Sequence, residues 1–267
     1  MTKLLSVIIP VYNEAPFLRR CLDSVNCHNS DVEIIVVDDG SADGSSEICD
    51  EYKDIENFKI GHHHTNWGVS MTRNHGMTLA EGKYITFLDA DDEMSEEGIS
   101  NMLRAITTKN GFVEDHPVRQ FNHYRYYHRT NKTVTKYKNR IGYYFYDNLP
   151  KMWCMVWNKM YLRSFIENNY IRFRSGLQYG EDELFNLKCL KYSPTIYCSD
   201  LITTIKHFEN QNSICHTLNK EKLLSQTEAL VDLLKQENSL VFDALVRNVI
   251  ADHWNSETYN KCIGGEL

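Results

Sequence analysis

The stretch from Leu4 to Ser41, LLSVIIPVYNEAPFLRRCLDSVNCHNSDVEIIVVDDGS, decides the fold. It contains two near-continuous runs rich in β-branched residues, Leu4–Pro10 and Glu33–Asp39. Such runs predict strands that are buried on both faces, as in a parallel sheet. Between them, Ala15–Val25 places apolar side chains at helical spacing. The order strand, helix, strand predicts a βαβ unit.

The same alternation continues along the chain. We predict further helices over 41–52 (with Ser41 or Asp43 as a possible cap), 69–81 and 95–107, and strands over 58–60 and 84–88. Residues 1–110 therefore indicate an α/β nucleotide-binding half. For the second half we predict exposed antiparallel strands within 121–146, a strand over 196–205, and helices over 157–168, 183–192, 220–236 and 240–254.

Composition narrows the class of protein. The 267 residues are 42% apolar and 24% charged, an ordinary globular balance, and the net charge of −7 disfavours a nucleic-acid binder. None of the eight cysteines forms a C-x-x-C pair, which argues against a zinc ribbon. The apolar run 4–11 is too short for a signal peptide and no stretch approaches a membrane span, so we expect reduced thiols in a cytoplasmic protein.

Acidic residues follow three of the predicted strands. Glu14 follows the first, Asp38-Asp39 ends the second, and Asp89-Ala90-Asp91-Asp92 follows the strand at 84–88. The carboxyl ends of such strands meet at one edge of the sheet, where clustered carboxylates need a cation such as Mg²⁺ or Mn²⁺. Each motif alone could be a turn or a helix cap. Together they predict a site for a nucleotide diphosphate and a metal ion.

Five motifs, in this order and spacing, closely resemble those of family 2 glycosyltransferases with the GT-A fold. They are VIIPVYNE at 7–14, VVDDGS at 36–41, NWGVSMTRN at 66–74, FLDADD at 87–92 and YGEDELF at 179–185. The resemblance covers residues 4–215. It implies a single α/β domain over 1–215 with a mainly parallel central sheet flanked by helices. Its nucleotide-sugar-binding half would be 1–110 and its acceptor-binding half 111–215, followed by a C-terminal helical extension over 216–267.

The resemblance assigns donor-binding roles by position. Tyr12 and Asp39 would face the nucleobase, where Asp39 accepts a hydrogen bond from uracil. Asp91 would be the main protein ligand of Mn²⁺ or Mg²⁺, and Arg73 would lie near the donor phosphates or brace the acidic rim. The full set of implied donor-binding residues is Pro10, Tyr12, Glu14, Asp39, Arg73, Asp89 and Asp91.

The resemblance also implies a mechanism. Members of this family invert the anomeric centre by a single displacement, with Asp182 as the general base and the metal at Asp91 stabilising the leaving diphosphate. The alternative interpretation of residues 181–183 is that their charge complements the dipole of the following helix. A helix start lowers a carboxyl pKa and a crowd of carboxylates raises it, so the sequence leaves the net shift open.

Several other residues have more weakly supported roles. The segment Lys206–Ser213 resembles the family's C-terminal segment, in which a basic residue and a serine close over the donor. His207 is a candidate ligand of the metal or a phosphate, or else a surface histidine. Trp153 and Glu181 are candidate acceptor contacts, although Trp153 could equally pack in the core. We interpret His62–His64 as a solvated strand end, because neighbours on a strand point to opposite faces.

Residues 119–140 carry seven Lys or Arg, interleaved with tyrosines, and no Asp or Glu. They could form a solvated β surface, or bind an anionic acceptor such as a diphosphate-linked lipid at a membrane surface. Single-stranded nucleic acid is a third, weaker interpretation. We therefore expect a protein that contacts its donor and a glycan or lipid-linked acceptor, with peripheral membrane contact at the inner face as an open possibility, and no nucleic acid.

Three other functions fit the sequence less well. A sugar nucleotidyltransferase would need a Gly-rich, basic triphosphate loop, which Pro10–Glu14 does not supply. A non-catalytic sugar-nucleotide-binding subunit is disfavoured by the presence of Asp91 and Asp182. The lack of G-x-G-x-x-G argues against a nicotinamide dehydrogenase. The prediction is transfer of a hexose-type sugar, from a uridine donor by analogy, in surface polysaccharide or glycan synthesis. The apolar face over 223–234 could pack on its own domain or form a homodimer.

Overall fold

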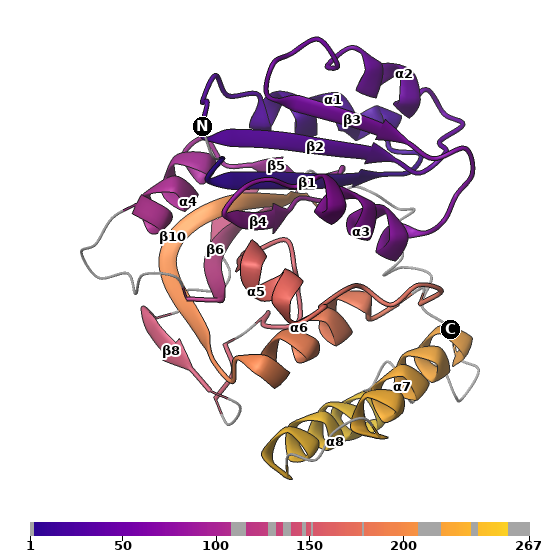
Figure 1. Cartoon of the computed structure of the whole chain (residues 1–267), viewed down its shortest axis with the longest axis vertical. Helices are drawn as coiled ribbons and strands as arrows, with labels where there is room; N and C mark the ends of the chain where they lie inside the picture. Colours follow the sequence, from indigo (N-terminus) through magenta and orange to yellow (C-terminus); the bar gives the residue numbers. More distant parts are fainter. Residues whose placement is uncertain are drawn as a thin grey trace.

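The computed structural model describes residues 3–107, 116–127, 132–135, 140–145, 148–150, 152–177, 179–207, 220–235 and 240–255. Within them the chain builds a ten-stranded sheet in the order β3-β2-β1-β4-β9-β6-β10-β5, with β7 paired to β6 and β8 to β10. Helices flank this sheet, and a helical hairpin near the C-terminus lies next to one of these helices, α6 (Glu181–Tyr192) (Figure 1).

The first half of the sheet is parallel. Its strands are β1 (Leu5–Val11), β2 (Val32–Asp38), β3 (Phe58–His62) and β4 (Tyr84–Phe87). Its helices are α1 (Ala15–Val25), α2 (Ser45–Asp50) and α3 (Val69–Leu79). Alternate residues of β1 enter different cores, since Val7 packs with Leu18 of α1 whereas Ile8 packs with Met77 of α3. The predicted βαβ pattern is confirmed, and both faces of these strands are covered.

The second half of the sheet is mixed. Its strands are β5 (Glu93–Met94), β6 (Val118–Tyr127), β7 (Lys132–Thr135), β8 (Gly142–Tyr144), β9 (Lys159–Leu162) and β10 (Ile196–His207). β9 is antiparallel to both β4 and β6, while β6 and β10 are parallel. The helix predicted over 157–168 is therefore wrong in its first part, where a buried strand precedes α5 (Arg163–Asn168).

The prediction of exposed strands over 121–146 is also wrong for the start of β6. Phe121 and His123 are buried, because β6 lies inside the sheet between β9 and β10. Arg119, which we counted in a basic surface, is buried too. Its guanidinium donates to the Ala105 carbonyl and lies over the Tyr84 ring. Residues 128–131 and 136–139 of the basic segment lie outside the described residues, so its contact with a membrane or acceptor stays a prediction.

The remaining helices are α4 (Gly98–Thr107), α6 (Glu181–Tyr192), α7 (Lys220–Lys235) and α8 (Leu240–Asn255). α7 and α8 form the hairpin beside α6 (Figure 1). Leu230 of α7 and Val246 of α8 are buried in the same core as Leu187 of α6, so the apolar face of α7 packs on its own domain. Leu224 and Val231 remain exposed. Among the described helices, none combines the length and apolarity that a membrane span requires.

Candidate active site

Hydrogen bonds join the loops after β1 and β2 at the carboxyl edge of the sheet. The Asn13 N–H donates to Ser41 Oγ (2.9 Å) and the Ala15 N–H to Asp43 Oδ2 (3.0 Å). The prediction that a helix starts at Ser41, with Ser41 or Asp43 as its cap, is wrong, because α2 (Ser45–Asp50) has Gly44 as its N-cap. The Ser41 hydroxyl accepts from the first loop instead. Asp43 serves both loops, because its Oδ1 accepts from the N–H of Ser45 (3.1 Å), the first residue of α2. The two loops form one connected rim.

This rim carries three of the predicted donor-binding residues. Pro10 lies near the end of β1, Tyr12 follows that strand with 47% of its surface exposed, and Glu14 immediately precedes α1. An exposed aromatic ring on a loop that is tied down at both sides has a flat face free for stacking at little cost in conformational entropy.

Asp39 is buried and fully organised by the loop between β3 and α3. Its Oδ1 lies 2.7 Å from His63 Nδ1 and accepts from the Trp67 N–H (2.9 Å), while its Oδ2 accepts from the Gly68 N–H (2.8 Å). His63 Nε2 in turn lies 2.9 Å from His75 Nδ1. Oδ2 has one protein donor in this set, so it keeps capacity for a further hydrogen bond.

His63 corrects our interpretation of the histidine run. His62 and His64 are exposed as predicted, but His63 is buried and stacked against the Trp67 ring with 4.3 Å between ring centroids. His63 is the first residue after β3, and its ring points inward, toward Asp39. Burial and the neighbouring His63 lower the pKa of His75.

Arg73 of α3 joins three carboxylates that come from distant parts of the chain. Its Nη1 lies 2.7 Å from Asp182 Oδ1 and 2.9 Å from Glu181 Oε1, and its Nη2 lies 3.1 Å from Asp89 Oδ1. The guanidinium is buried and lies over the Phe173 ring. Of the two roles implied for Arg73, the geometry matches bracing of the acidic rim.

Asp182 lies in the first turn of α6, held by two different partners. Besides Arg73 at Oδ1, its Oδ2 accepts from the Val156 N–H (3.2 Å). Burial raises the pKa of Asp182 to about 7, with the charges of Glu181 and Asp89 adding to the rise and Arg73 opposing it. A carboxylate whose pKa lies near the working pH suits general-base catalysis.

Gly180 places this first turn. Its φ of +76° is left-handed, and a Cβ there would overlap the side chain of Gln226 on α7, which donates to Glu183 Oε2 (2.8 Å). We expect Gly180→Ala to destabilise the fold by about 1–2 kcal/mol from backbone strain, with an added loss from the overlap, and to lower turnover. Thermal unfolding and a turnover assay check this.

Gly176→Ala is the matched control for that change. Gly176 has the same φ of +76°, but a Cβ there meets open space. It therefore isolates the backbone strain. Equal loss of stability in the two variants would contradict a specific role for the contact with α7.

Asp89, Asp91 and Asp92 form an acidic cluster after β4, with ligand atoms all within 4.8 Å of one another. Lys206 of β10 enters this cluster. Its Nζ lies 2.7 Å from Asp92 Oδ2, 3.1 Å from Asp89 Oδ2 and 3.8 Å from Asp91 Oδ1. Sequence reasoning placed Lys206 only within a segment that closes over the donor, and missed both this contact and the burial of Asp92. The strand pairing that brings β10 beside β5 has no local signal.

The cluster fits a hard divalent cation. Three carboxylates offer the oxygen ligands that Mg²⁺ and Mn²⁺ prefer. Burial raises the pKa of Asp92 to about 8, and Asp91 and Asp89 add to the rise although Lys206 opposes it. Three carboxylates thus face the Lys206 ammonium and, at Asp89, the Arg73 guanidinium that Asp89 shares with Glu181 and Asp182, which leaves the combined acidic group short of positive charge.

The other predicted residues lie around this centre. The His207 N–H donates to Asp92 Oδ1 (2.9 Å), but the His207 ring faces Glu93, with Nε2 3.2 Å from Oε1. His207 is not in the acidic cluster found among the described residues. Trp153 is half-buried, lies within the turn of residues 152–156 that contacts Asp182, and packs against the core. These roles stay predictions.

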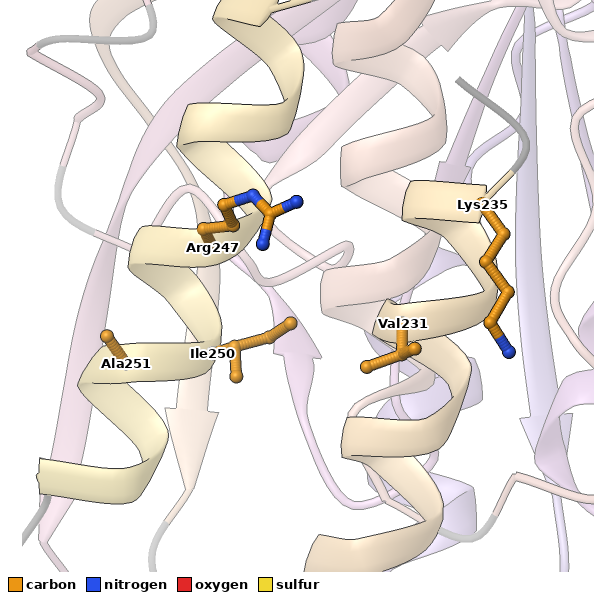
Figure 2. Close-up of a pocket in the computed structure, with 5 residues that line it drawn as sticks. All are labelled: Val231, Lys235, Arg247, Ile250 and Ala251. Carbon is orange, nitrogen blue, oxygen red and sulfur yellow. The ribbon is translucent and has the colours of Figure 1, made fainter. Parts of the chain in front are cut away.

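A groove of about 600 Å³ lies elsewhere, between α7 and α8. Figure 2 shows the side chains that line it: Val231, Lys235, Arg247, Ile250 and Ala251. None of the predicted site residues lines it, and the acidic cluster comes from other elements. We therefore place the candidate site at the sheet edge.

Comparison with known proteins identifies relatives of the chain. Residues 6–169 match the model of Glycosyl transferase family 2. The chain is 30% identical over 254 residues to the putative glycosyltransferase EpsH of Bacillus subtilis, covering 90% of this chain and 71% of EpsH.

Two solved structures share the fold. TarS of Staphylococcus aureus, a poly(ribitol-phosphate) β-N-acetylglucosaminyltransferase, solved with UDP-GlcNAc, matches with a TM-score of 0.77 at 21% identity, over 97% of this chain and 74% of that one. The mannosyltransferase PcManGT of Pyrobaculum calidifontis, solved with GDP-Man and Mn²⁺, matches with a TM-score of 0.66 at 12% identity, over 96% and 71%. The predicted α/β architecture is confirmed.

Proposed function

Because the chain belongs to glycosyltransferase family 2, we propose that it transfers a hexose-type sugar, with inversion, from a nucleoside diphosphate donor to an acceptor hydroxyl. The observation that carries this proposal is the position of Arg73, which joins Asp89 at the donor edge to Asp182 at the start of α6. Arg73 would thereby fix the position of the base relative to the site of the leaving group. A uridine diphosphate sugar is the donor we favour, and a surface glycan the acceptor, by analogy with TarS.

Donor binding starts at the rim formed by the first two loops. Tyr12 offers an exposed ring to the nucleobase, and Asp39 Oδ2 accepts a hydrogen bond from it. Because His63 and two backbone N–H groups already fix the Asp39 carboxylate, it does not have to be ordered when the donor binds. Pro10 and Glu14 shape the same pocket.

The leaving diphosphate is stabilised beside the acidic cluster. Asp89, Asp91 and Asp92 would hold Mg²⁺ or Mn²⁺, with Asp91 as the main ligand, and the bound ion would supply a Lewis acid for the departing phosphate charge. The Lys206 ammonium adds a second positive charge at this position. His207 stays a lower-ranked candidate ligand.

Asp182 removes the proton from the acceptor hydroxyl. The hydroxyl oxygen then forms a bond to the anomeric carbon while the bond from that carbon to the diphosphate oxygen breaks, and the electron pair leaves with the diphosphate. Arg73 holds the base in place throughout. Glu181 and Trp153 line the acceptor side. A single displacement of this kind inverts the anomeric centre without a covalent enzyme intermediate.

A panel of sugar nucleotides tests the proposal. UDP-N-acetylglucosamine, UDP-glucose, UDP-galactose and GDP-mannose are each incubated with the protein and Mn²⁺, and nucleotide release is measured. We expect release from at least one UDP-sugar, and an inverted anomeric configuration in the product by NMR. Failure with every donor, by a protein that is folded in circular dichroism, would reject the proposal.

Metal dependence gives a second prediction. EDTA is expected to abolish turnover and Mn²⁺ to restore it. Asp91→Asn is expected to raise the Mn²⁺ concentration for half-maximal turnover by at least roughly tenfold, since even outer partners of a metal site are worth about 10- to 100-fold. The control is Asp232→Asn, which changes an ion pair on α7 away from the cluster. Full turnover of the wild type in EDTA would contradict a metal at this site.

A further inference from the structure

Lys159, the first residue of β9, is a fully buried lysine. Its ammonium donates to three uncharged acceptors: the carbonyls of Met152 (3.1 Å) and Met155 (2.5 Å) and Asn158 Oδ1 (2.9 Å). A buried charge is costly, and burial lowers the pKa of Lys159 to about 8. The three acceptors match the three hydrogens of the charged form.

The turn that Lys159 holds is in contact with the proposed base. This turn, residues 152–156, ends at Val156, whose N–H donates to Asp182 Oδ2 (3.2 Å). Asn186 of α6 adds a second connection, because its Nδ2 donates to the Cys154 carbonyl (2.9 Å) and to the Asp182 carbonyl (2.9 Å). The position of the Asp182 carboxylate therefore depends on where this turn lies.

We propose that Lys159 is a positioning residue, whose ammonium fixes the 152–156 turn so that the Val156 N–H orients the Asp182 carboxylate for proton removal. The inference rests on the proposed function. Without the ammonium, the carbonyls of Met152 and Met155 lose a buried donor, and the turn shifts toward other partners. A displacement of about 1 Å at a base costs on the order of 100-fold in rate.

The protonation of Lys159 can be distinguished from that of its titratable neighbours. Those that interact with it are Cys154 in the turn, Asp182 and Cys189 on α6, Cys198 on β10 and His123 on β6. Burial raises the pKa of all three thiols, to about 12 for Cys154 and Cys198, and lowers the pKa of His123 to about 4. Within this group, Asp182 and Lys159 alone titrate between pH 6 and 9. Above pH 8 the neutral amine has two hydrogens for three acceptors.

Lys159→Met tests the proposal, with turnover measured on the best sugar nucleotide of the panel and binding measured with UDP. We expect kcat to fall about 100-fold with UDP affinity unchanged. Lys159→Gln, which keeps two N–H donors, is expected to recover part of the loss. The matched control is Lys188→Met, which removes a half-buried lysine of α6 that donates to the Arg172 carbonyl. Its kcat should equal that of the wild type.

The pH profile provides an independent measurement. Wild-type kcat is expected to fall above pH 8, and both Lys159 variants should lack that decline. A wild-type kcat in Lys159→Met, or a parallel loss of kcat, UDP binding and thermal stability, would overturn the proposal. If Lys159→Met does not fold, a wild-type profile that stays flat to pH 9 overturns it.

Failure of the proposed function is recognised separately, because then the wild type itself shows no turnover. In that case, amide hydrogen exchange tests whether Lys159 positions the turn. Amides of the 152–156 turn should exchange faster in Lys159→Met than in Lys188→Met, and equal rates would overturn the positioning role.

Discussion

Asp182→Asn is expected to lower kcat about 10³-fold, within the usual contribution of a general base, while UDP affinity stays within about twofold of the wild type. The amide keeps the size of the side chain but cannot accept a proton from the acceptor hydroxyl. The residues proposed to face the nucleobase, Tyr12 and Asp39, lie on other elements, directly after β1 and β2. Arg73, which contacts Asp182, keeps the amide oxygen as a hydrogen-bond acceptor. Turnover and isothermal calorimetry with UDP measure the two quantities.

The pH dependence of turnover follows from the same carboxyl. Its pKa is raised to about 7, and it acts as a base only when deprotonated, so wild-type kcat should fall as the pH drops through 7. The residual turnover of Asp182→Asn should show no such decline. Asp232→Asn on α7 is the matched control, since it makes the same chemical change away from the site. Normal turnover in Asp182→Asn would reject the assignment.

Arg73→Met is expected to cost about 3–5 kcal/mol of unfolding free energy, the range for removing one partner of a buried charge group, and to abolish turnover. Three carboxylates, which are 14–25% exposed, would lose their shared and buried cation. The pKa of Asp89 is lowered in the wild type, with Lys206 and Arg73 opposing the effect of burial. The stability that the attraction between Arg73 and Asp89 contributes is present at neutral pH. It is lost as the pH falls through the folded pKa of Asp89. That loss falls below pH 4, because the folded pKa of Asp89 lies below 3.8. The Asp182 carboxyl, whose pKa is about 7, is charged at pH 8 and neutral at pH 4, so its attraction to Arg73 is lost between these values, and the deficit of the variant should be larger at pH 8 than at pH 4.

Chemical denaturation at the two pH values measures this difference. Arg19→Met is the control, because Arg19 makes a bidentate ion pair with Glu51 in which both side chains are about half exposed. Such pairs are screened by water, and little change in stability is expected. A similarly small effect of Arg73→Met would show that the carboxylates are compensated by other groups.

The sequence predicted those parts of the fold that have a local signal. The buried β-branched runs located β1, β2 and β4, and helical spacing located α1 and α6 to within two residues. β9 has no such signal, since its residues Lys159–Leu162 combine a lysine and a tyrosine that are buried only because β4 and β6 lie on either side. Arg119 was misplaced for the same reason.

The residues of the candidate site also fall into those with a local sequence signal and those without one. Asp39, Asp89, Asp91 and Asp182 belong to motifs, so the sequence could name them. The contacts between them depend on residues far apart in the chain. Arg73 and Asp182 are 109 positions apart. Lys206 and Asp92 are 114 apart. His63 also eluded prediction, because its burial and its contacts with Asp39, Trp67 and His75 depend on how the chain folds around it.

The packing of Gln226 against Gly180 affects the stage of synthesis at which the protein can become active. The start of α6 carries the proposed base, and its support comes from a helix more than forty positions later in the chain. While a nascent chain is still attached to the ribosome with α7 in the exit tunnel, the sheet can form but this support is missing. We therefore expect activity to appear only after synthesis has passed α7 and released it to dock.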